Sequence, residues 1–232
     1  MNIRVLVVTS DRYLWALRPF HYLFDVFWST LQPVLVAGYT PPPFPLPPNF
    51  QFQSIDPRPY PAEMWSDGLI LFLRGLPDSH VVLMLEDYWL CRRVDTQGVN
   101  SLADYIHGKQ EVLRMDLTND RLYAGGMFDV EPWGHYDIIE TPPGTPYQMS
   151  LQAGIWNRER LLEVLQPGKT PWQVEVETGA DAMQGLRVLG TRQSPIRYIN
   201  AFKSGDAENA LNLGGLPQEH ADELNRRGWL LR

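Results

Sequence analysis

The chain has 232 residues, of which 44% are hydrophobic and 20% are charged, with a formal net charge of -7 and a pI near 5.2. This composition is typical of a globular protein and excludes disorder as the main state. Nucleic-acid binders usually present a basic face, so the acidic balance argues against a nucleic-acid partner. The single cysteine, Cys91, excludes an internal disulfide and a zinc site built from cysteines.

Hydropathy and the N-terminal residues bear on location. No stretch approaches the roughly 18 to 20 apolar residues that a membrane span needs. The first residues, MNIRVLVVTSDR, lack the long apolar core and the small-residue cleavage site of a signal peptide. We therefore expect a cytoplasmic protein without a membrane span. The sequence gives no prediction of oligomeric state.

The first 61 residues predict two strands, a helix and a long loop. Residues 3–11, IRVLVVTSD, predict a buried strand that opens into a polar loop, a candidate nucleotide contact. Pro19 is expected to begin a helix, and residues 33–39, PVLVAGY, predict a second strand. The proline-dense segment Pro41–Pro61 is expected to be an extended surface loop, because proline lacks an amide donor and fixes its own φ.

Strands and helices continue to alternate up to residue 118. Residues 63–76 show a helical apolar period, Val81–Leu85 reads as a short buried strand, residues 99–108 as a short helix and residues 111–118 as a further strand. This alternation is typical of a mostly parallel sheet with helices on both faces. We predict an α/β fold with a Rossmann-like central sheet.

The second half changes character and is expected to be α+β. Strand-like pieces are YDIIE and YQMSLQA, at residues 136–140 and 147–153. Asn157 is a good N-cap for a helix, and Thr170 with Gln173 forms a capping-box pattern that places Glu175 about one turn into the next helix. A last helix is expected near the C-terminus, packing Leu224. We predict a single domain over 1–232, with halves 1–120 and 121–232.

Two adjacent acids follow the third predicted strand in the sequence LMLEDYWL. An open α/β sheet binds ligands beyond the carboxyl ends of its strands, so Glu86 and Asp87 lie where a ligand would bind. Neighbouring residues of a strand point to opposite sides, so both could serve one ion only if a turn separates them. A hard cation such as Mg²⁺ or Mn²⁺ suits carboxylates and substrate phosphates better than zinc does.

Residues 1 to 200 resemble the GT-A type of nucleotide-sugar glycosyltransferase, in the compact form common in bacteria and phages. The polar TSD loop, the acidic strand end in LMLEDYWL, the segment SLQAGIWNRERLLEVL and the motif PWQVE carry this resemblance. It implies a nucleotide-sugar donor and a hydroxyl acceptor, which would be a saccharide, a protein or another hydroxyl compound.

The resemblance assigns donor-side roles. It implies nucleotide contacts at Thr9, Ser10 and Asp11, and a metal and diphosphate site at Glu86 and Asp87, with Asp87 as the ligand of Mn²⁺ or Mg²⁺. The family motif has two acids flanking one residue, whereas here Tyr88 follows Glu86 and Asp87 at the third position. A site that holds the diphosphate through positive side chains therefore stays open. Candidates for this role are Arg12, Arg92, Arg93 and Lys203.

The acceptor side of the resemblance centres on Glu175. In inverting members a carboxylate at the start of a helix deprotonates the acceptor, and Glu175 in PWQVE matches this place, with Glu177 as a second choice. A carboxylate must be ionised to act as a general base, and a helix N-terminus favours the ionised form. Gln152, Trp156 and Trp172 are candidate acceptor contacts, because sugars stack on aromatic rings and bond polar groups.

Two other classes of function remain open. One is a nucleotide or nucleotide-sugar hydrolase, or a nucleotidyltransferase, that uses the same sheet and acids. The other is a non-catalytic carbohydrate-binding or assembly protein that kept the fold and lost the complete acidic motif. The donor sugar, the nucleotide and the acceptor are not readable from the residues.

Overall fold

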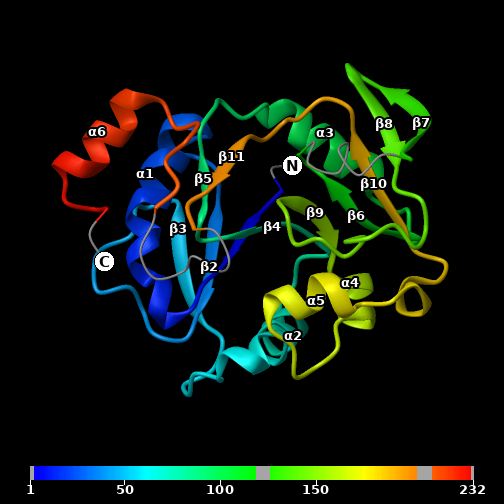
Figure 1. The fold of residues 1–232 in the computed structure, drawn as a ribbon, viewed down its shortest axis with the longest axis horizontal. Coiled ribbons are helices and arrows are strands. Elements are labelled where there is room, and N and C mark those ends of the chain that lie inside the picture. The colour runs from blue at the N-terminus through cyan, green and yellow to red at the C-terminus, as the bar shows by residue number, and fades with distance from the viewer. Residues whose placement is uncertain (1–2, 119–125, 203–210, 231–232) are drawn as a thin grey trace.

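The computed structural model describes residues 3–118, 126–202 and 211–230, and its elements follow the chain as Figure 1 shows. The strands are β1 (Val5–Val8), β2 (Val34–Gly38), β3 (Phe50–Ser54), β4 (His80–Leu85), β5 (Tyr88–Leu90), β6 (Val112–Asp116), β7 (Phe128–Trp133), β8 (Tyr136–Glu140), β9 (Gly154–Asn157), β10 (Arg187–Thr191) and β11 (Tyr198–Asn200). The α-helices are α1 (Leu17–Phe27), α2 (Trp65–Gly75), α3 (Thr96–Ile106), α4 (Arg158–Val164), α5 (Pro171–Glu177) and α6 (Gln218–Arg226), and short 3-10 helices are η1 (Asp11–Ala16), η2 (Ala62–Met64) and η4 (Ala180–Met183).

One large, mainly parallel sheet organises the part of the chain that the structure describes. Its nine strands run in the order β3-β2-β1-β4-β9-β6-β10-β8-β7. The strands β3, β2, β1 and β4 are parallel neighbours, and β6 and β10 pair in parallel farther along. β9 and β8 run against their neighbours, so the remaining strands share one direction. The predicted mixed α/β fold with a mainly parallel sheet is confirmed.

Helices cover both faces of the sheet, and alternation along β1 explains the two layers. Val5 and Val7 pack with residues of α1 and α3 on one face, whereas Leu6 and Val8 pack with residues of α2, α4 and α5 on the other. All four β1 side chains are buried, as expected for a central strand covered on both sides. In Figure 1, α2, α4 and α5 lie together below the sheet and α1 lies at its left.

The two predicted halves of the chain share this sheet. β9, from the second half, lies between β4 and β6 of the first half and pairs antiparallel with both. A separate ribbon joins β5 to β11, pairing Tyr88 with Asn200. Residues from both halves therefore meet at the end of β4.

The prediction of a continuous loop over Pro41–Pro61 was wrong, because this segment contains β3. β3 pairs in parallel with β2 at the edge of the sheet. Prolines are absent from residues 49–56, and an edge strand tolerates prolines on either side because its outer groups pair with nothing. Phe50, buried at 7% exposure, anchors the strand on the core.

Two other local predictions were wrong. Pro19 is not the first residue of a helix, because α1 already begins at Leu17 and continues directly from η1. Residues 147–153 form turns rather than a strand, and the strand β9 begins only at Gly154. Tyr147 has a positive φ of 56°, which an extended strand excludes. The predicted capping box of α5 and the Asn157 cap of α4 are confirmed.

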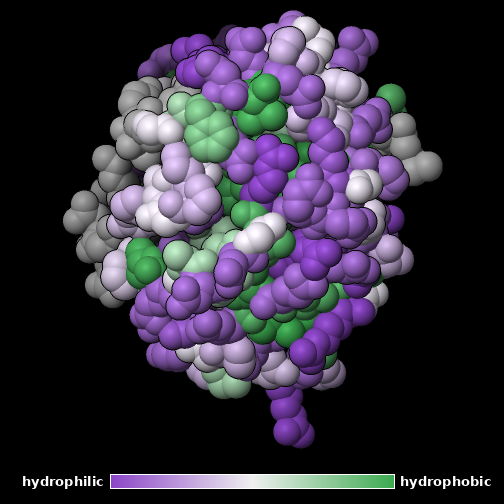
Figure 2. All heavy atoms as spheres, turned by 90° about the vertical axis from the view of Figure 1, so that its right-hand side faces the viewer, coloured by the Kyte–Doolittle hydropathy of each residue, from purple (hydrophilic) through white to green (hydrophobic). Residues whose placement is uncertain are grey.

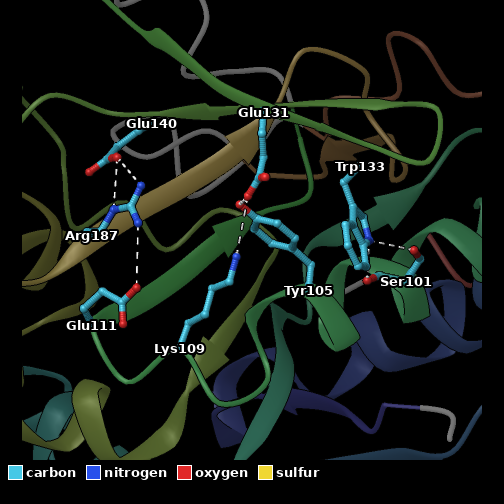
Figure 3. A network of polar contacts seen from close by, with 8 residues as sticks. All are labelled: Ser101, Tyr105, Lys109, Glu111, Glu131, Trp133, Glu140 and Arg187. Atoms are coloured by element: carbon cyan, nitrogen blue, oxygen red, sulfur yellow. Dashed lines mark hydrogen bonds and ion pairs between the residues drawn. The ribbon is translucent and has the colours of Figure 1, made fainter.

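The face of the molecule on the side of β7 and β8 is mostly hydrophilic, with hydrophobic atoms showing near its lower centre (Figure 2). The β7–β8 hairpin is tied to α3 by polar contacts (Figure 3): Tyr105 donates to Glu131 at 2.7 Å, and Trp133 donates to Ser101. None of the helices in residues 3–118, 126–202 and 211–230 combines the length and apolar character that a membrane crossing requires.

Candidate active site

A cleft of about 690 Å³ opens at the carboxyl ends of β1 and β4. Its lining comes from both halves of the chain: Thr9, Ser10, Tyr13, Trp65, Leu85, Glu86, Asp87, Tyr88, Gln152, Pro171, Glu175, Asn200, Phe202 and Asn212. This is the edge of an open α/β sheet at which ligands bind. The cleft is the candidate active site.

The register of the two central strands brings the first loop beside the acids. Val8 of β1 pairs with Leu85 of β4, so the residues that follow each strand emerge at the same level. Glu86 and Asp87 form a turn between β4 and β5. The two side chains are therefore not restricted to the opposite sides of a strand. The carbonyl of Asp87 accepts from the Ala201 amide at 2.8 Å, so the β11 end is fixed to the same turn.

Burial makes both acids of this turn hard to ionise. Glu86 is 8% exposed, and its pKa lies well above its ordinary value because of desolvation and the neighbouring charge of Asp87. Desolvation also raises the pKa of Asp87 to about 7. A nearby positive charge would favour the ionised forms of both. The turn therefore holds two carboxyl groups whose neutral forms are favoured by burial.

Glu175 reaches the cleft from α5 and is held by the loop before β9. Its Oε1 accepts a hydrogen bond from the Leu151 amide at 2.6 Å and lies 3.4 Å from the Ser150 hydroxyl. The first turn of α5 contains no acid, and Glu175 lies beyond it. The Leu151 amide, rather than the helix N-terminus, is therefore the group that stabilises the ionised Glu175 carboxylate. Among the described residues, Oε2 makes no hydrogen bond.

Most of the predicted site residues meet in this cleft. Thr9, Ser10, Glu86, Asp87, Gln152 and Glu175 all line it, although they come from four separate segments of the chain. Glu177 is excluded from this group because it is exposed and pairs with Lys169, whose ammonium lowers the Glu177 pKa. The sequence therefore predicted residues that the fold brings together.

Other predicted residues lie elsewhere. Asp11 is exposed and accepts hydrogen bonds from the amide and hydroxyl of Thr40 at 3.0 and 2.8 Å, so it shapes the loop after β2. Arg12 is exposed and, with Trp172, does not line the cleft. Trp172 remains a candidate contact because it is 58% exposed beside Pro171. Lys203 lies outside the described residues.

The prediction of an acceptor contact at Trp156 was wrong for this structure. Trp156 is fully buried on β9, where its ring lies 4.7 Å from the guanidinium carbon of Arg114. The residue occupies a central strand, so both faces of its neighbourhood are covered. It supports the sheet rather than a ligand.

Sequence reasoning missed the aromatic and amide groups that complete the cleft. Tyr13 stacks on Phe202 with ring centroids 5.5 Å apart, and Tyr88 stacks on Tyr198 at 4.4 Å. Tyr13 could have been noticed, since it follows the polar loop by only two residues. Asn200, Phe202 and Asn212 had no local signal. The pairing of β5 with β11 brings Asn200 here, Phe202 follows it by two residues, and the Asn212 amide donates to the Ala201 carbonyl at 3.0 Å.

A group of three or more histidine, cysteine or carboxylate side chains that could enclose a metal is absent from residues 3–118, 126–202 and 211–230. Positively charged side chains are likewise absent from the described lining of the cleft. A phosphate group that entered the cleft would face carboxylates, so its charge would have to be met by a bound cation or by groups beyond this lining.

Comparisons with known proteins bear on the fold alone. The sequence matches no protein-family model and no curated protein. TarS from S. aureus superposes with a TM-score of 0.51 at 12% identity, over 87% of this chain and 61% of that chain. UTP-bound UGPase from Acinetobacter baumannii superposes with a TM-score of 0.50 at 8% identity, over 98% of this chain and 94% of that one.

These two solved structures share the mixed α/β architecture with its mainly parallel sheet. The present chain spans only about three fifths of the TarS chain that it matches, at 61%. At such low identity the likeness extends to the fold, and the assignment of an activity depends on the residues of the cleft.

Proposed function

We propose that this protein is an inverting glycosyltransferase that moves a sugar from a nucleotide-sugar donor to a hydroxyl acceptor. The observation that carries the proposal is the convergence of Glu175 with Glu86, Asp87, Thr9 and Ser10 around one cleft at the carboxyl ends of the central strands. The sequence resemblance assigns these same positions to the base, the diphosphate and the nucleotide. Volume supports it too, because about 690 Å³ is within the usual range of ligand pockets.

The donor would lie along the ends of β1 and β4. Thr9 and Ser10 would contact the nucleotide, and Tyr13 with Phe202 would offer a stacked aromatic surface beside them. The diphosphate would reach the turn at Glu86 and Asp87. UTP is the nucleotide bound in the similar UGPase structure, which makes a uridine donor the first to test.

A divalent cation is part of this proposal, with Asp87 as its ligand and Glu86 beside it. The donor set fits Mn²⁺ or Mg²⁺, because such ions often take one or two protein carboxylates and complete their shell with water and substrate phosphates. The raised pKa values of both acids, caused by burial, are consistent with a site that is completed by positive charge. When bound, the cation would neutralise the diphosphate leaving group.

Glu175 would act as the general base. The Leu151 amide holds Oε1, which leaves Oε2 to accept the proton of the acceptor hydroxyl. The acceptor oxygen forms a bond to the anomeric carbon as the bond from that carbon to the diphosphate breaks, and the nucleoside diphosphate leaves. Attack opposite the leaving group inverts the anomeric centre. Gln152 and the exposed Trp172 would contact the acceptor.

The second candidate is a nucleotidyltransferase or a nucleotide-sugar hydrolase. The specific observation in its favour is the match to UTP-bound UGPase, which covers 98% of this chain. The described lining of the cleft offers no positive side chain to a diphosphate or to a triphosphate, so both candidates need a bound cation or groups beyond this lining. In a non-catalytic carbohydrate-binding protein, the Glu175 carboxylate, which the Leu151 amide holds in place, would have no catalytic role.

The variant Glu175→Gln tests the proposal. It keeps the shape of the side chain and the bond from Leu151 but cannot accept a proton, so we expect transfer to fall by about 10²- to 10⁴-fold. Donor binding, measured by calorimetry, should stay within error of the wild type. Glu177→Gln, which alters the exposed neighbour, is the matched control. Unchanged turnover in Glu175→Gln would end the assignment.

A further inference from the structure

A buried ion pair lies beneath the loop that holds Glu175. Arg114 and Asp116 stand two residues apart on β6, with Nε of Arg114 at 2.6 Å from Oδ1 of Asp116. Their side chains are 0% and 4% exposed. Burying two charges costs desolvation free energy that an exposed ion pair largely avoids. Well-packed apolar residues in place of a buried ion pair often give equal or greater stability. The pair therefore calls for a role besides stability.

Two glycines make room for this pair. A Cβ at Gly154 on β9 would lie 3.2 Å from both Cγ and Cδ of Arg114, and a Cβ at Gly190 on β10 would lie 3.3 Å from Cβ of Asp116. Both glycines occupy strands next to β6, where glycine weakens the sheet and often marks a close approach. The surrounding strands are thus shaped to fit the pair.

Arg114 connects the pair to the cleft. Its Nη1 donates to the carbonyl of Ser150, and its guanidinium carbon lies 4.7 Å from the ring centroid of Trp156. The next residue, Leu151, donates its amide to Glu175 at 2.6 Å and accepts at its carbonyl from the Tyr88 hydroxyl at 3.3 Å. One peptide unit thus separates the buried guanidinium from the bond that holds the proposed base.

We propose that Arg114 is a positioning residue: anchored by Asp116, it fixes the Ser150–Leu151 peptide so that the Leu151 amide holds the carboxylate of Glu175 toward the cleft. This inference rests on the proposed function for its catalytic consequence. Its structural part concerns only the bond between Leu151 and Glu175. A misplacement of about 1 Å at a reacting group can cost about 10²-fold in rate, so loosening this peptide is expected to lower turnover.

The geometry explains why the guanidinium is the suitable group. Its planar fork presents several donors in fixed directions, so it can face Asp116 and Ser150 together. A lysine ammonium would keep the charge opposite Asp116 but offers a single point of attachment. Arg114→Lys therefore keeps the positive charge but removes the several donors of the guanidinium. The double variant Arg114→Met/Asp116→Asn removes both charges, so neither is left buried without its partner.

Three variants test the proposal: Arg114→Lys, the double variant Arg114→Met/Asp116→Asn, and the control Arg187→Met. Arg187 lies on the neighbouring strand β10 and pairs with Glu140 and Glu111 (Figure 3), and it does not line the cleft. Three readouts apply to each folded variant: hydrogen exchange of the Leu151 amide by NMR, the dissociation constant of the donor nucleotide, and kcat at saturating donor and acceptor.

We expect the double variant to exchange the Leu151 amide faster and to lose about 10²-fold in kcat, with donor affinity within about twofold of the wild type. For Arg114→Lys we expect an exchange rate of the Leu151 amide and a kcat between those of the double variant and the wild type. Arg187→Met should match the wild type in both. Wild-type exchange and kcat in a folded double variant would overturn the proposal. So would equal loss of donor affinity and kcat, or failure of both Arg114 variants to fold, since the pair would then serve the fold as a whole. If the wild-type protein transfers no sugar, the proposed function fails, whereas amide exchange still tests the positioning.

Discussion

Replacing Asp87 by asparagine is expected to stabilise the free protein at neutral pH. The folded state raises the pKa of this carboxyl from 3.8 to about 7 by burial. The folded chain thus binds the proton more tightly than the unfolded chain does. The stability that this preference contributes is fully present below pH 3.8 and is lost as the pH rises through about 7. The asparagine side chain of the variant never ionises and escapes that loss.

The size of the effect follows from the shift. A difference between 3.8 and about 7 corresponds to about 4 kcal/mol at most. The side chain keeps partial contact with water, which screens the charge, so we expect roughly half of this, about 2 kcal/mol, at pH 8. Near pH 4 the variant and the wild type should have similar stability.

Urea unfolding measured between pH 4 and pH 8 in the presence of a chelator tests this reasoning. The free energy of unfolding of Asp87→Asn minus that of the wild type should grow with pH. Ser10→Ala, in the same cleft without a titrating group, serves as the control and should show a difference that does not vary with pH. A variant that is less stable at pH 8, or a difference that is constant with pH, would refute the argument.

Three further predictions concern stability. Burial and the charges of Arg227 and Arg18 lower the pKa of His21 from 6.5 to about 4, so its neutral form contributes stability that is fully present above pH 6.5 and lost as the pH falls through about 4. His21→Phe should remove up to about 3 kcal/mol of this acid sensitivity, measured by urea unfolding at pH 4 and pH 7. Thr170→Ala should cost about 1 kcal/mol by removing the capping box of α5, with Thr170→Ser as the control in thermal unfolding. Gly98→Ala should lower the melting temperature, because the new Cβ would clash with the Tyr136 hydroxyl and lie 2.5 Å from the Asp95 carboxylate, which caps α3. A Gly98→Ala variant as stable as the wild type would contradict this contact.

The sequence predicted those parts of the fold that depend on local patterns. The buried run Val81–Leu85 and the capping box at Thr170 are recognisable from neighbouring residues, and both are confirmed. β3 was hidden because surrounding prolines dominated the composition, although FQFQS alternates as a strand does. The strand expected over residues 147–153 was wrong because the backbone turns there through local hydrogen bonds, from the Gln148 amide to the Thr145 carbonyl and from the Ser150 amide to the Tyr147 carbonyl.

The candidate site shows the same division. Glu86 and Asp87 could be predicted because two acids directly follow a buried strand, whereas Glu175 was predicted from the family resemblance of PWQVE. Asn200 and Phe202 could not, since they join the cleft through the long-range pairing of β11 with β5. Trp156 was misjudged because β9 lies between β4 and β6 and is buried along its whole length, a long-range placement that local residues do not determine.

The products formed from a nucleotide sugar distinguish sugar transfer from the other activities. The wild-type protein would be incubated with a panel of uridine and other nucleotide sugars, Mn²⁺ or Mg²⁺ and simple hydroxyl acceptors, with a sample that lacks the acceptor as the control for hydrolysis, and the products would be identified by phosphorus and proton NMR. We expect a nucleoside diphosphate and a glycosylated acceptor of inverted anomeric configuration, both lost in Glu175→Gln. A nucleoside monophosphate with a sugar 1-phosphate, or pyrophosphate formed from a nucleoside triphosphate and a sugar phosphate, would contradict this expectation.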